Sequence, residues 1–328
     1  MTFDERVKAL EFLRLTDRQT RFLTTVALHS GYCLRRQYLS FAGVRYGKNV
    51  RDFLDGLVMR GIALRFTYRA DRGHVYHLHA RSIYRALQQD DNRNRRVASP
   101  ALIARKLMLL DLVLSEPEVE WFATEHDKVE LFTSRYGVDR DDLPQRTFDG
   151  VGEDEPTSTR YFMDKLPIYV PRSTAVPHFV CLASDTSTQG FEQFLRDHRR
   201  LFARLPTWVV VCAKPAHVGD LADHETTFSD FIDGRTVGSA DRLRRLFATR
   251  RLVEDSQFGK LSAEDLHAFR QARRVFATSR TERLYVAWLA DGDAAFADVG
   301  APPPGSGQLL IRTLPHTYEQ FGTMAGVA

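Results

Sequence analysis

The sequence is poor in cysteine and has no long apolar run. Its 328 residues include three cysteines, Cys33, Cys181 and Cys212. Their spacing matches neither a CxxC pair nor a cysteine–histidine zinc finger. No stretch approaches the roughly 18 apolar residues that a membrane span needs. The first residues, MTFDERVKALEFLRL, carry acids and lack the apolar core of a secretory signal. We therefore expect reduced thiols, no membrane segment and a cytoplasmic location.

Motifs of several common enzyme classes are also missing. The chain contains no GxxxxGK[ST] phosphate loop, no GxGxxG after a strand, no GxSxG and no HExxH. His77 and His79 fall on one face of an expected strand, but no third metal ligand follows nearby. We expect no cofactor and no bound metal.

Positive charge is concentrated near the N-terminus. Length predicts two or three domains, and 43% hydrophobic with 27% charged residues is typical of globular proteins. Residues 1–96 hold 19 of the 46 Lys and Arg residues but 9 of the 42 Asp and Glu residues, a balance of +10 against −6 for the remainder. This asymmetry favours a first domain that meets a polyanion.

Three short helices and a hairpin are predicted in the first domain. Residues 16–30 begin with a capping Thr16 or Asp17 and end before Gly31. Residues 34–42 form a second helix, and residues 47–60 form a third. The third helix has one apolar face, made of Val50, Phe53, Leu54, Leu57 and Val58. Two strand-like runs, 62–69 and 74–78, flank the turn ADRG.

This order of elements is that of a winged helix-turn-helix, whose third helix enters the major groove of double-stranded DNA. Arg45, Asn49 and Arg51 are predicted to read base edges, because Arg and Asn make bidentate contacts with guanine and adenine. Basic residues suit phosphates. The predicted phosphate and wing contacts are Arg35, Arg36, Lys48, Arg69, Arg72 and His74. A winged helix that contacts protein remains the alternative.

A connection and an apolar helix follow. Residues 88–99, QQDDNRNRRVAS, are polar and predict an exposed link. Residues 100–114 begin with Pro and are apolar around most of the helix circumference. Such a helix is buried either in the second domain or against its copy in a homodimer. We divide the chain into residues 1–87, 88–118 and 119–328.

The last part predicts a small α/β domain with a helical extension, so that the fold class is α+β. The runs 178–182 and 208–212, joined by an amphipathic helix over 190–204, predict a βαβ unit with parallel strands. The other predictions are a helix over 119–137, a loop over 145–160, strands at 160–162, 167–170 and 309–314, helices at 241–252 and 262–288, and a loop at 300–308.

The acidic residues of this domain offer one alternative, a nuclease site. Metal-dependent cleavage needs clustered carboxylates, commonly an Asp and an Asp/Glu-x-Lys on neighbouring strands. Asp164, Asp185 and Glu192 are the candidates, but CLASDTS has no acid two residues before Asp185 and no Lys two residues after it. We therefore favour a loop-capping role for Asp185 and a protein that is not an enzyme. An endonuclease, or an accessory subunit of a recombinase or defence complex, is the alternative.

The segments LTDRQTRFLTTVALHSGYCLRRQYLSFAG and GKNVRDFLDGLVMRGIALRF, with the hairpin after them, resemble the replication-relaxation family of winged-helix proteins from plasmids and integrative elements. The resemblance covers residues 15–215. It implies that Arg45, Lys48, Asn49 and Arg51 are recognition-helix positions. It also implies a degenerate restriction-endonuclease-like sheet, in which Ala183 stands at a position that is acidic in the family pattern.

The resemblance further implies a site-specific DNA-binding protein that regulates the transcription, replication or transfer of a mobile element. Its C-terminal domain would then recruit a protein partner or dimerise.

Overall fold

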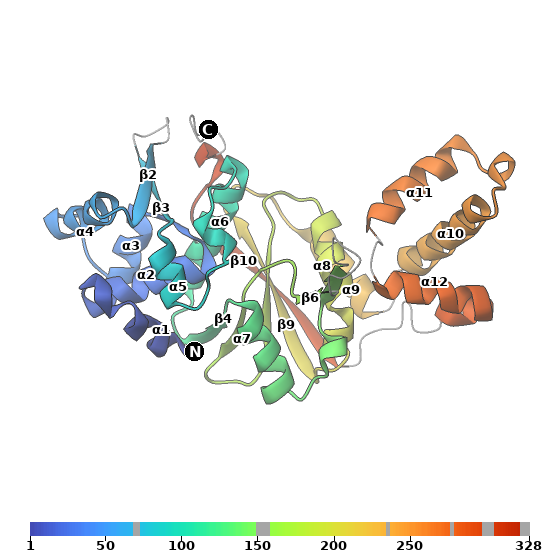
Figure 1. The fold of residues 1–328 in the computed structure, drawn as a ribbon, viewed down its shortest axis with the longest axis horizontal. Helices are drawn as coiled ribbons and strands as arrows, with labels where there is room; N and C mark the ends of the chain where they lie inside the picture. Colours follow the sequence, from blue (N-terminus) through green and yellow to red (C-terminus); the bar gives the residue numbers. More distant parts are fainter. Residues whose placement is uncertain (68–72, 149–157, 234–236, 276–278, 297–304, 322–328) are drawn as a thin grey trace.

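The chain folds into a mixed α+β structure, seen here in a computed structural model (Figure 1). The structure describes residues 1–67, 73–148, 158–233, 237–275, 279–296 and 305–321. The helices are α1 (Phe3–Ala9), α2 (Asp17–His29), α3 (Arg35–Ala42), α4 (Lys48–Met59), α5 (Arg81–Ala86), α6 (Pro100–Ser115), α7 (Glu125–Glu130), α8 (Gln189–Phe202), α9 (Ala222–Ile232), α10 (Val237–Glu254), α11 (Ala263–Val275) and α12 (Ser279–Asp291). The strands are β1 (Tyr32–Leu34), β2 (Ala63–Thr67), β3 (His74–Leu78), β4 (Val119–Phe122), β5 (Gln145–Phe148), β6 (Ser158–Tyr161), β7 (Ile168–Pro171), β8 (His178–Leu182), β9 (Thr207–Pro215) and β10 (Ser306–Leu314).

The three predicted helices of the N-terminal unit, residues 1–87, are confirmed as α2, α3 and α4, and the hairpin as β2 and β3. Thr16 caps α2 by accepting from the Gln19 backbone, and the Gln19 side chain accepts from the Thr16 backbone in return. Gly43, at φ 62°, ends α3 in the left-handed conformation. The short strand β1, which the sequence did not predict, pairs antiparallel with β3 and completes a sheet of order β1-β3-β2.

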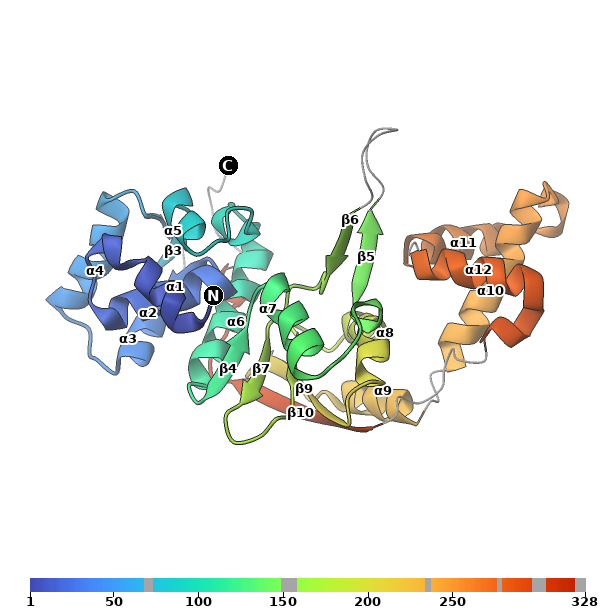
Figure 2. The ribbon, with the colours of Figure 1, turned by 60° about the horizontal axis from the view of Figure 1, so that its bottom comes forward.

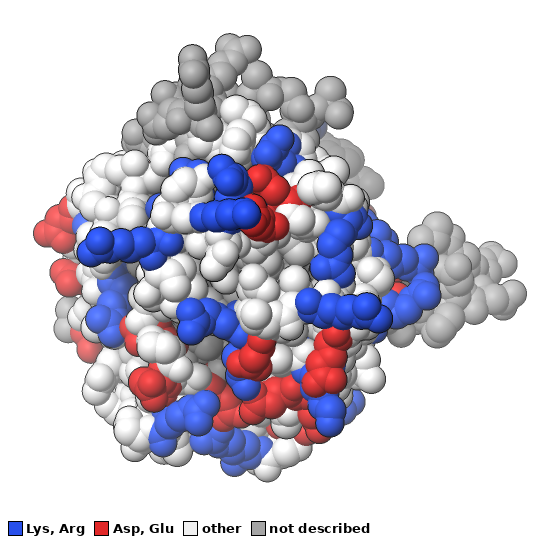
Figure 3. Space-filling view, turned by 90° about the vertical axis from the view of Figure 1, so that its left-hand side faces the viewer, with Lys and Arg blue, Asp and Glu red and all other residues white. Residues whose placement is uncertain are grey.

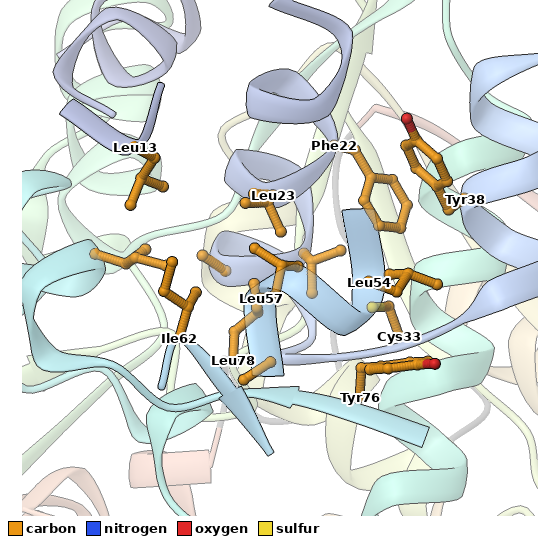
Figure 4. Packing of buried hydrophobic residues seen from close by; sticks show 14 of the residues in the cluster. Leu13, Phe22, Leu23, Cys33, Tyr38, Leu54, Leu57, Ile62, Tyr76 and Leu78 are labelled. Atoms are coloured by element: carbon orange, nitrogen blue, oxygen red, sulfur yellow. The ribbon is translucent and has the colours of Figure 1, made fainter. Parts of the chain in front are cut away.

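The apolar faces of these helices meet in one core (Figure 4). Phe22 and Leu23 of α2 are fully buried, and Leu54 and Leu57 of α4 pack against the same cluster. Phe22 also makes an edge contact with Tyr38 of α3, with 5.0 Å between the ring centroids. Because the helical periodicity buries this stripe, the opposite side of α4 must face solvent.

The central sheet consists of five described strands in the order β10-β9-β8-β7-β4. β8, α8 and β9 form the predicted βαβ unit with parallel strands. β10 extends the parallel part, whereas β7 and β4 run antiparallel. Helices α8 and α9 cover one face of this sheet, and α6 covers the other.

Two of the predictions for this region were wrong. Residues 119–122 begin the predicted helix but form strand β4, because their backbone pairs with β7. The predicted loop over 145–160 contains strand residues at both ends, since β5 pairs with β6. Residues 149–157 between them lie outside the described residues.

The helical extension forms a separate group at the far end of the molecule (Figures 1 and 2). The predicted helix over 262–288 is two helices, α11 and α12, and α10 precedes them. Their small shared core is centred on the buried Phe247 and Tyr285. In the part of the chain that the structure describes, no helix is long and apolar enough to cross a bilayer.

Helix α6 is buried within its own chain. Leu110 packs with the core of the N-terminal unit, while Leu107 and Val113 pack with sheet residues such as Val211. The sequence left two burial sites open for this helix, the second domain or a dimer partner. In the structure α6 is covered by both parts of its own chain.

None of residues 88–99 is buried, which agrees with the exposed link that we predicted, but this connection before α6 is also docked on the N-terminal unit. The Asn94 side chain donates hydrogen bonds to the carbonyls of Ala27 and Leu28, at 3.0 and 3.1 Å. The backbone oxygen of Asn94 lies so close to Gly31 that a Cβ on Gly31 would be 2.2 Å away. Lys106 of α6 donates to Ser30 and to the Asn94 side chain. The polar composition indicated exposure but not the long-range hydrogen bonds of Asn94, which fix the segment on α2.

A buried histidine between the N-terminal unit and the sheet predicts acid sensitivity. His29 is buried against Trp121, and burial, with help from Lys128 and Arg6, lowers its pKa to about 3. The unfolded histidine has a pKa of about 6.5, so that protons favour the unfolded chain between these two values. We expect His29 to cost about 1.4 kcal/mol of stability for each pH unit below 6.

Urea denaturation of wild type and His29→Leu at several pH values between 5 and 7 measures this effect. His29→Leu should have a shallower fall in stability with acid. A residual fall is expected, because burial also lowers the pKa of His77, to about 4. Identical pH slopes for the two proteins would contradict this role of His29.

Candidate nucleic-acid interface

The solvent side of α4 carries polar and basic groups at its start. Val50, Phe53 and Leu54 are buried, whereas Lys48, Asn49 and Arg51 are exposed, as is Arg45 just before the helix. This is the division that the apolar periodicity predicted. The first turn of α4 can therefore approach a ligand with side chains and backbone together.

The N-terminus of α4 has no side-chain cap. Gly47 is the N-cap residue and its neighbours supply no side-chain hydrogen bond to the first turn. The leading backbone N–H groups of a helix are unpaired donors and carry the positive end of the helix dipole. Beside the exposed Lys48, they suit an anion such as a phosphate.

The start of α3 contacts the turn before α4 and lies near the hairpin. The guanidinium of Arg35, the first residue of α3, lies 4.2 Å from the centre of the Tyr46 ring, and Tyr46 precedes α4. His74 begins the second strand of the hairpin, and burial and then the charges of Arg65 and Arg35 lower its pKa. The structure thus brings the start of α3, the turn before α4 and the hairpin to one side. His74 is neutral near pH 7, because its pKa lies below the ordinary 6.5.

Acidic residues are interspersed with these basic ones. Asp55 of α4 accepts a hydrogen bond from Arg65 at 3.2 Å, and Asp52 lies 4.0 Å from Arg51. Figure 3 shows this side of the molecule, where Lys and Arg groups are spread among Asp and Glu groups instead of forming a uniform patch. The Asp55–Arg65 hydrogen bond must rearrange before Arg65 can contact an anion, whereas the Arg51–Asp52 pair, with both side chains more than half exposed, constrains Arg51 little.

Arg36 is not part of this group. Its guanidinium donates to both carboxylate oxygens of Asp111 in α6, at 2.7 and 2.6 Å. Tyr318 donates to the same carboxylate at 2.6 Å, and burial followed by the Asp111 charge raises the pKa of this phenol. Arg36 therefore joins α3 to α6 and to the C-terminal segment. The predicted wing residues Arg69 and Arg72 lie outside the described residues.

The three candidate carboxylates of the α/β domain have separate local roles. Asp164 accepts from the Leu166 backbone at 3.0 Å and lies 3.5 Å from His198 Nε2. Asp185 accepts from the Ser187 backbone at 2.9 Å, which is the loop-capping role favoured above.

Glu192 accepts from the Thr188 hydroxyl at 3.0 Å and lies 3.5 Å from Arg196. Among the residues that the structure describes, no group of three His, Cys, Asp or Glu residues is arranged to hold a metal ion.

A buried cation lies near Asp164 instead. Lys128 of α7 is 1% exposed, and its ammonium donates to the Leu166 carbonyl at 2.5 Å, 5.4 Å from the centre of the Phe162 ring. Burial lowers its pKa, and the charge of Asp164 opposes that change. The positive charge of this lysine disfavours a metal cation beside Asp164. In the sequence, the single Lys of the run EHDKVE gave no signal that it would be buried there.

Tyr46, Arg65 and Asp55 also lie on this side of the N-terminal unit, although the sequence did not single out Arg65 or Asp55. Their involvement depends on the pairing of β2 with β3, which places Arg65 opposite Tyr76, and on the packing of α4 beside β2. Alternation along β2 gave no signal for Arg65, because Leu64 and Arg65 are both exposed and Ala63, on the same side of the strand as Arg65, is buried.

Comparison of the chain with protein-family models, with curated proteins and with solved structures found no match. Function is therefore inferred from the residues of the interface and their geometry.

Two neighbouring arginines should behave differently on substitution. We expect Arg36→Ala to lower the free energy of unfolding by about 1–3 kcal/mol, because it leaves the Asp111 carboxylate, 9% exposed, without its cation. Arg35→Ala should change it by less than about 0.5 kcal/mol, because Arg35 is exposed. Urea denaturation of both variants tests this, and equal losses would refute the assigned role of Arg36.

Proposed function

We propose that this protein binds double-stranded DNA in a sequence-selective way. The observation that carries the proposal is the gathering of the start of α3, the exposed first turn of α4 and the hairpin on one side of the N-terminal unit. The order α2-β1-α3-α4-β2-β3, with β1 paired to β3, supports a winged helix-turn-helix. In that arrangement α4 is the element that enters the major groove.

The exposed side chains of the proposed interface fall into two groups, those suited to base edges and those suited to phosphates. Arg45, Asn49 and Arg51 are proposed to contact base edges, where their planar donor and acceptor groups discriminate between bases. Lys48 and Arg35 are proposed to contact phosphates, together with the uncapped start of α4. The hairpin is proposed to lie beside the backbone or an adjacent groove, with His74 at the start of β3; the predicted contacts Arg69 and Arg72 fall outside the described residues.

The α/β domain is proposed as a non-catalytic body that resembles a restriction-endonuclease-like sheet. Its strands β4, β7 and β8 run antiparallel in succession, and α8 crosses to the parallel β9. The dispersal of Asp164, Asp185 and Glu192 supports the absence of cleavage. On the resemblance of the sequence, the DNA would be a control site of a mobile element.

Substitution of a base-contacting and a phosphate-contacting residue should give different signatures. Arg51→Ala should cost about 1–3 kcal/mol on the preferred duplex and little on other duplexes. Lys48→Ala should weaken binding on all duplexes and reduce the slope of log affinity against log salt by about one. Fluorescence anisotropy with duplexes from the neighbourhood of its own gene and a scrambled duplex, at two salt concentrations, measures both.

Arg242→Ala is the matched control, because Arg242 is exposed on α10, far from the N-terminal unit. It should bind as wild type does. Equal losses for Arg51→Ala and Lys48→Ala on every duplex would refute the division of roles, and no binding at low salt would refute the proposed function. Added Mg²⁺ should leave the duplexes intact.

The ion pair between Asp55 and Arg65 predicts a gain of affinity. Asp55→Asn keeps the size of the side chain, removes a negative charge that faces the DNA and releases Arg65. We expect tighter binding to every duplex, by about 0.5–1 kcal/mol at low salt, with a steeper salt dependence. Unchanged or weaker binding in the same anisotropy assay would place Asp55 away from the DNA.

A further inference from the structure

The outer edge of the central sheet is open along β10. This strand pairs with β9 in an unbroken parallel register from Ser306–Thr207 to Leu314–Pro215 and has no neighbour on its other side among the described strands. Figure 2 shows β10 along the border of the sheet with no ribbon beyond it. A strand edge presents a row of backbone donors and acceptors that need partners.

The hydrogen bonds define which residues present these groups. The Ser306 N–H donates to the carbonyl of Pro206, at the start of β9, at 2.9 Å. Because the direction of N–H and C=O alternates along a strand, the even-numbered residues of β10 face β9 and the odd-numbered residues face outward. The outward residues are Gly307, Leu309, Ile311 and Thr313.

The usual protections of an edge strand are missing here. Natural edges are short, bulged, proline-containing or charged. β10 has nine residues, an unbroken register and no proline. Its single charge, Arg312, is paired at 2.9 Å with Glu116, at the end of α6. By contrast, the opposite edge β4 has four residues and carries Glu120, and Pro117 precedes it.

The sequence of β10 is complementary to itself. An antiparallel copy related by a two-fold axis at Leu310 keeps all nine residues paired. It places the three central apolar residues opposite apolar ones and Arg312 opposite an uncharged residue. The cross-strand pairs are Leu310–Leu310, Leu309–Ile311, Gln308–Arg312, Gly307–Thr313 and Ser306–Leu314. Such apolar pairs stabilise a sheet, and no like charges meet. Leu310, 36% exposed in the single chain, is then covered by its copy.

We propose that two copies of this chain associate through antiparallel pairing of their β10 strands, which joins their central sheets into one. The proposal goes beyond DNA binding and does not depend on it. It places the dimer contact on β10 and leaves α6 in the core of each chain. The two N-terminal units are then related by the two-fold axis, a symmetry that suits two half-sites on a duplex.

A cysteine at the proposed axis tests the register. Leu310 is a non-hydrogen-bonded position toward the copy, where Cα atoms lie about 4.5 Å apart, within the range of a disulfide. We expect Leu310→Cys to form a covalent dimer rapidly under mild oxidation of the full chain. The native Cys33, Cys181 and Cys212 are buried and add little background.

Gln308→Cys is the matched control. It has the same exposed environment and the same strand face, but the two copies of residue 308 would be roughly 13 Å apart, too far for a bond. Cross-linking of Leu310→Cys well above Gln308→Cys on a non-reducing gel supports the proposal. Equal cross-linking of the two variants, or none, overturns it.

Proline at the edge supplies a second test. Thr313 is exposed and its N–H faces outward, so that Thr313→Pro removes a donor toward the copy and none toward β9. Light scattering on the eluting protein at micromolar concentration should give a dimer for wild type and Thr313→Val, and a folded monomer for Thr313→Pro. A monomeric wild type, or a Thr313→Pro dimer, overturns the proposal.

Discussion

The burial of α6 on both of its sides is the constraint that organises this molecule. A helix that is apolar around most of its circumference must be covered all round. Here the N-terminal unit covers one side and the central sheet covers the other, so that Leu110 belongs to one core and Leu107 to the next. The parts that the sequence divided at residues 87 and 118 therefore share an interior, and the orientation of α4 relative to the sheet follows from how α6 is packed.

Polar contacts reinforce this arrangement around α6. Arg6 of α1 forms a bidentate ion pair with Asp127 at the start of α7, where both side chains are at most 10% exposed. Lys106 and Asp111 of α6 bind Ser30 and Arg36 of the N-terminal unit. Ion pairs with little exposure are costly to break singly, because each leaves a charge without a partner. These contacts join the N-terminal unit to α6 and α7 by polar groups as well as by apolar packing.

Periodicity in the sequence predicted the elements whose structure is decided locally. The apolar spacing of Val50, Phe53 and Leu54 predicted both α4 and its exposed face, and the apolar run around Val210 predicted a strand in a parallel pair. Non-local pairing decided the rest. We predicted β4 as the start of a helix, but its Val, Trp and Phe favour a strand and it pairs with β7. The basic segment before α6 is docked by Asn94.

The sequence likewise predicted only part of the candidate site. Exposure of Lys48, Asn49 and Arg51 followed from helix geometry. The pairing of Arg36 with Asp111 did not, because these residues are 75 positions apart and meet through the packing of α3 on α6. The sequence of a basic segment does not distinguish an arginine that is free to contact a ligand from one that joins two helices.

The contact between Tyr318 and Asp111 spans 207 positions of the chain. During synthesis the N-terminal unit emerges first and can form its own core, yet the side of α6 that faces the sheet remains uncovered until β8, β9 and the segment around Tyr318 have followed. Domains generally fold as they leave the ribosome, and exposed apolar surface in the meantime invites association. Until Tyr318 arrives, α6 therefore exposes apolar surface, and a chain interrupted before it would leave this side of the helix open to association with other chains.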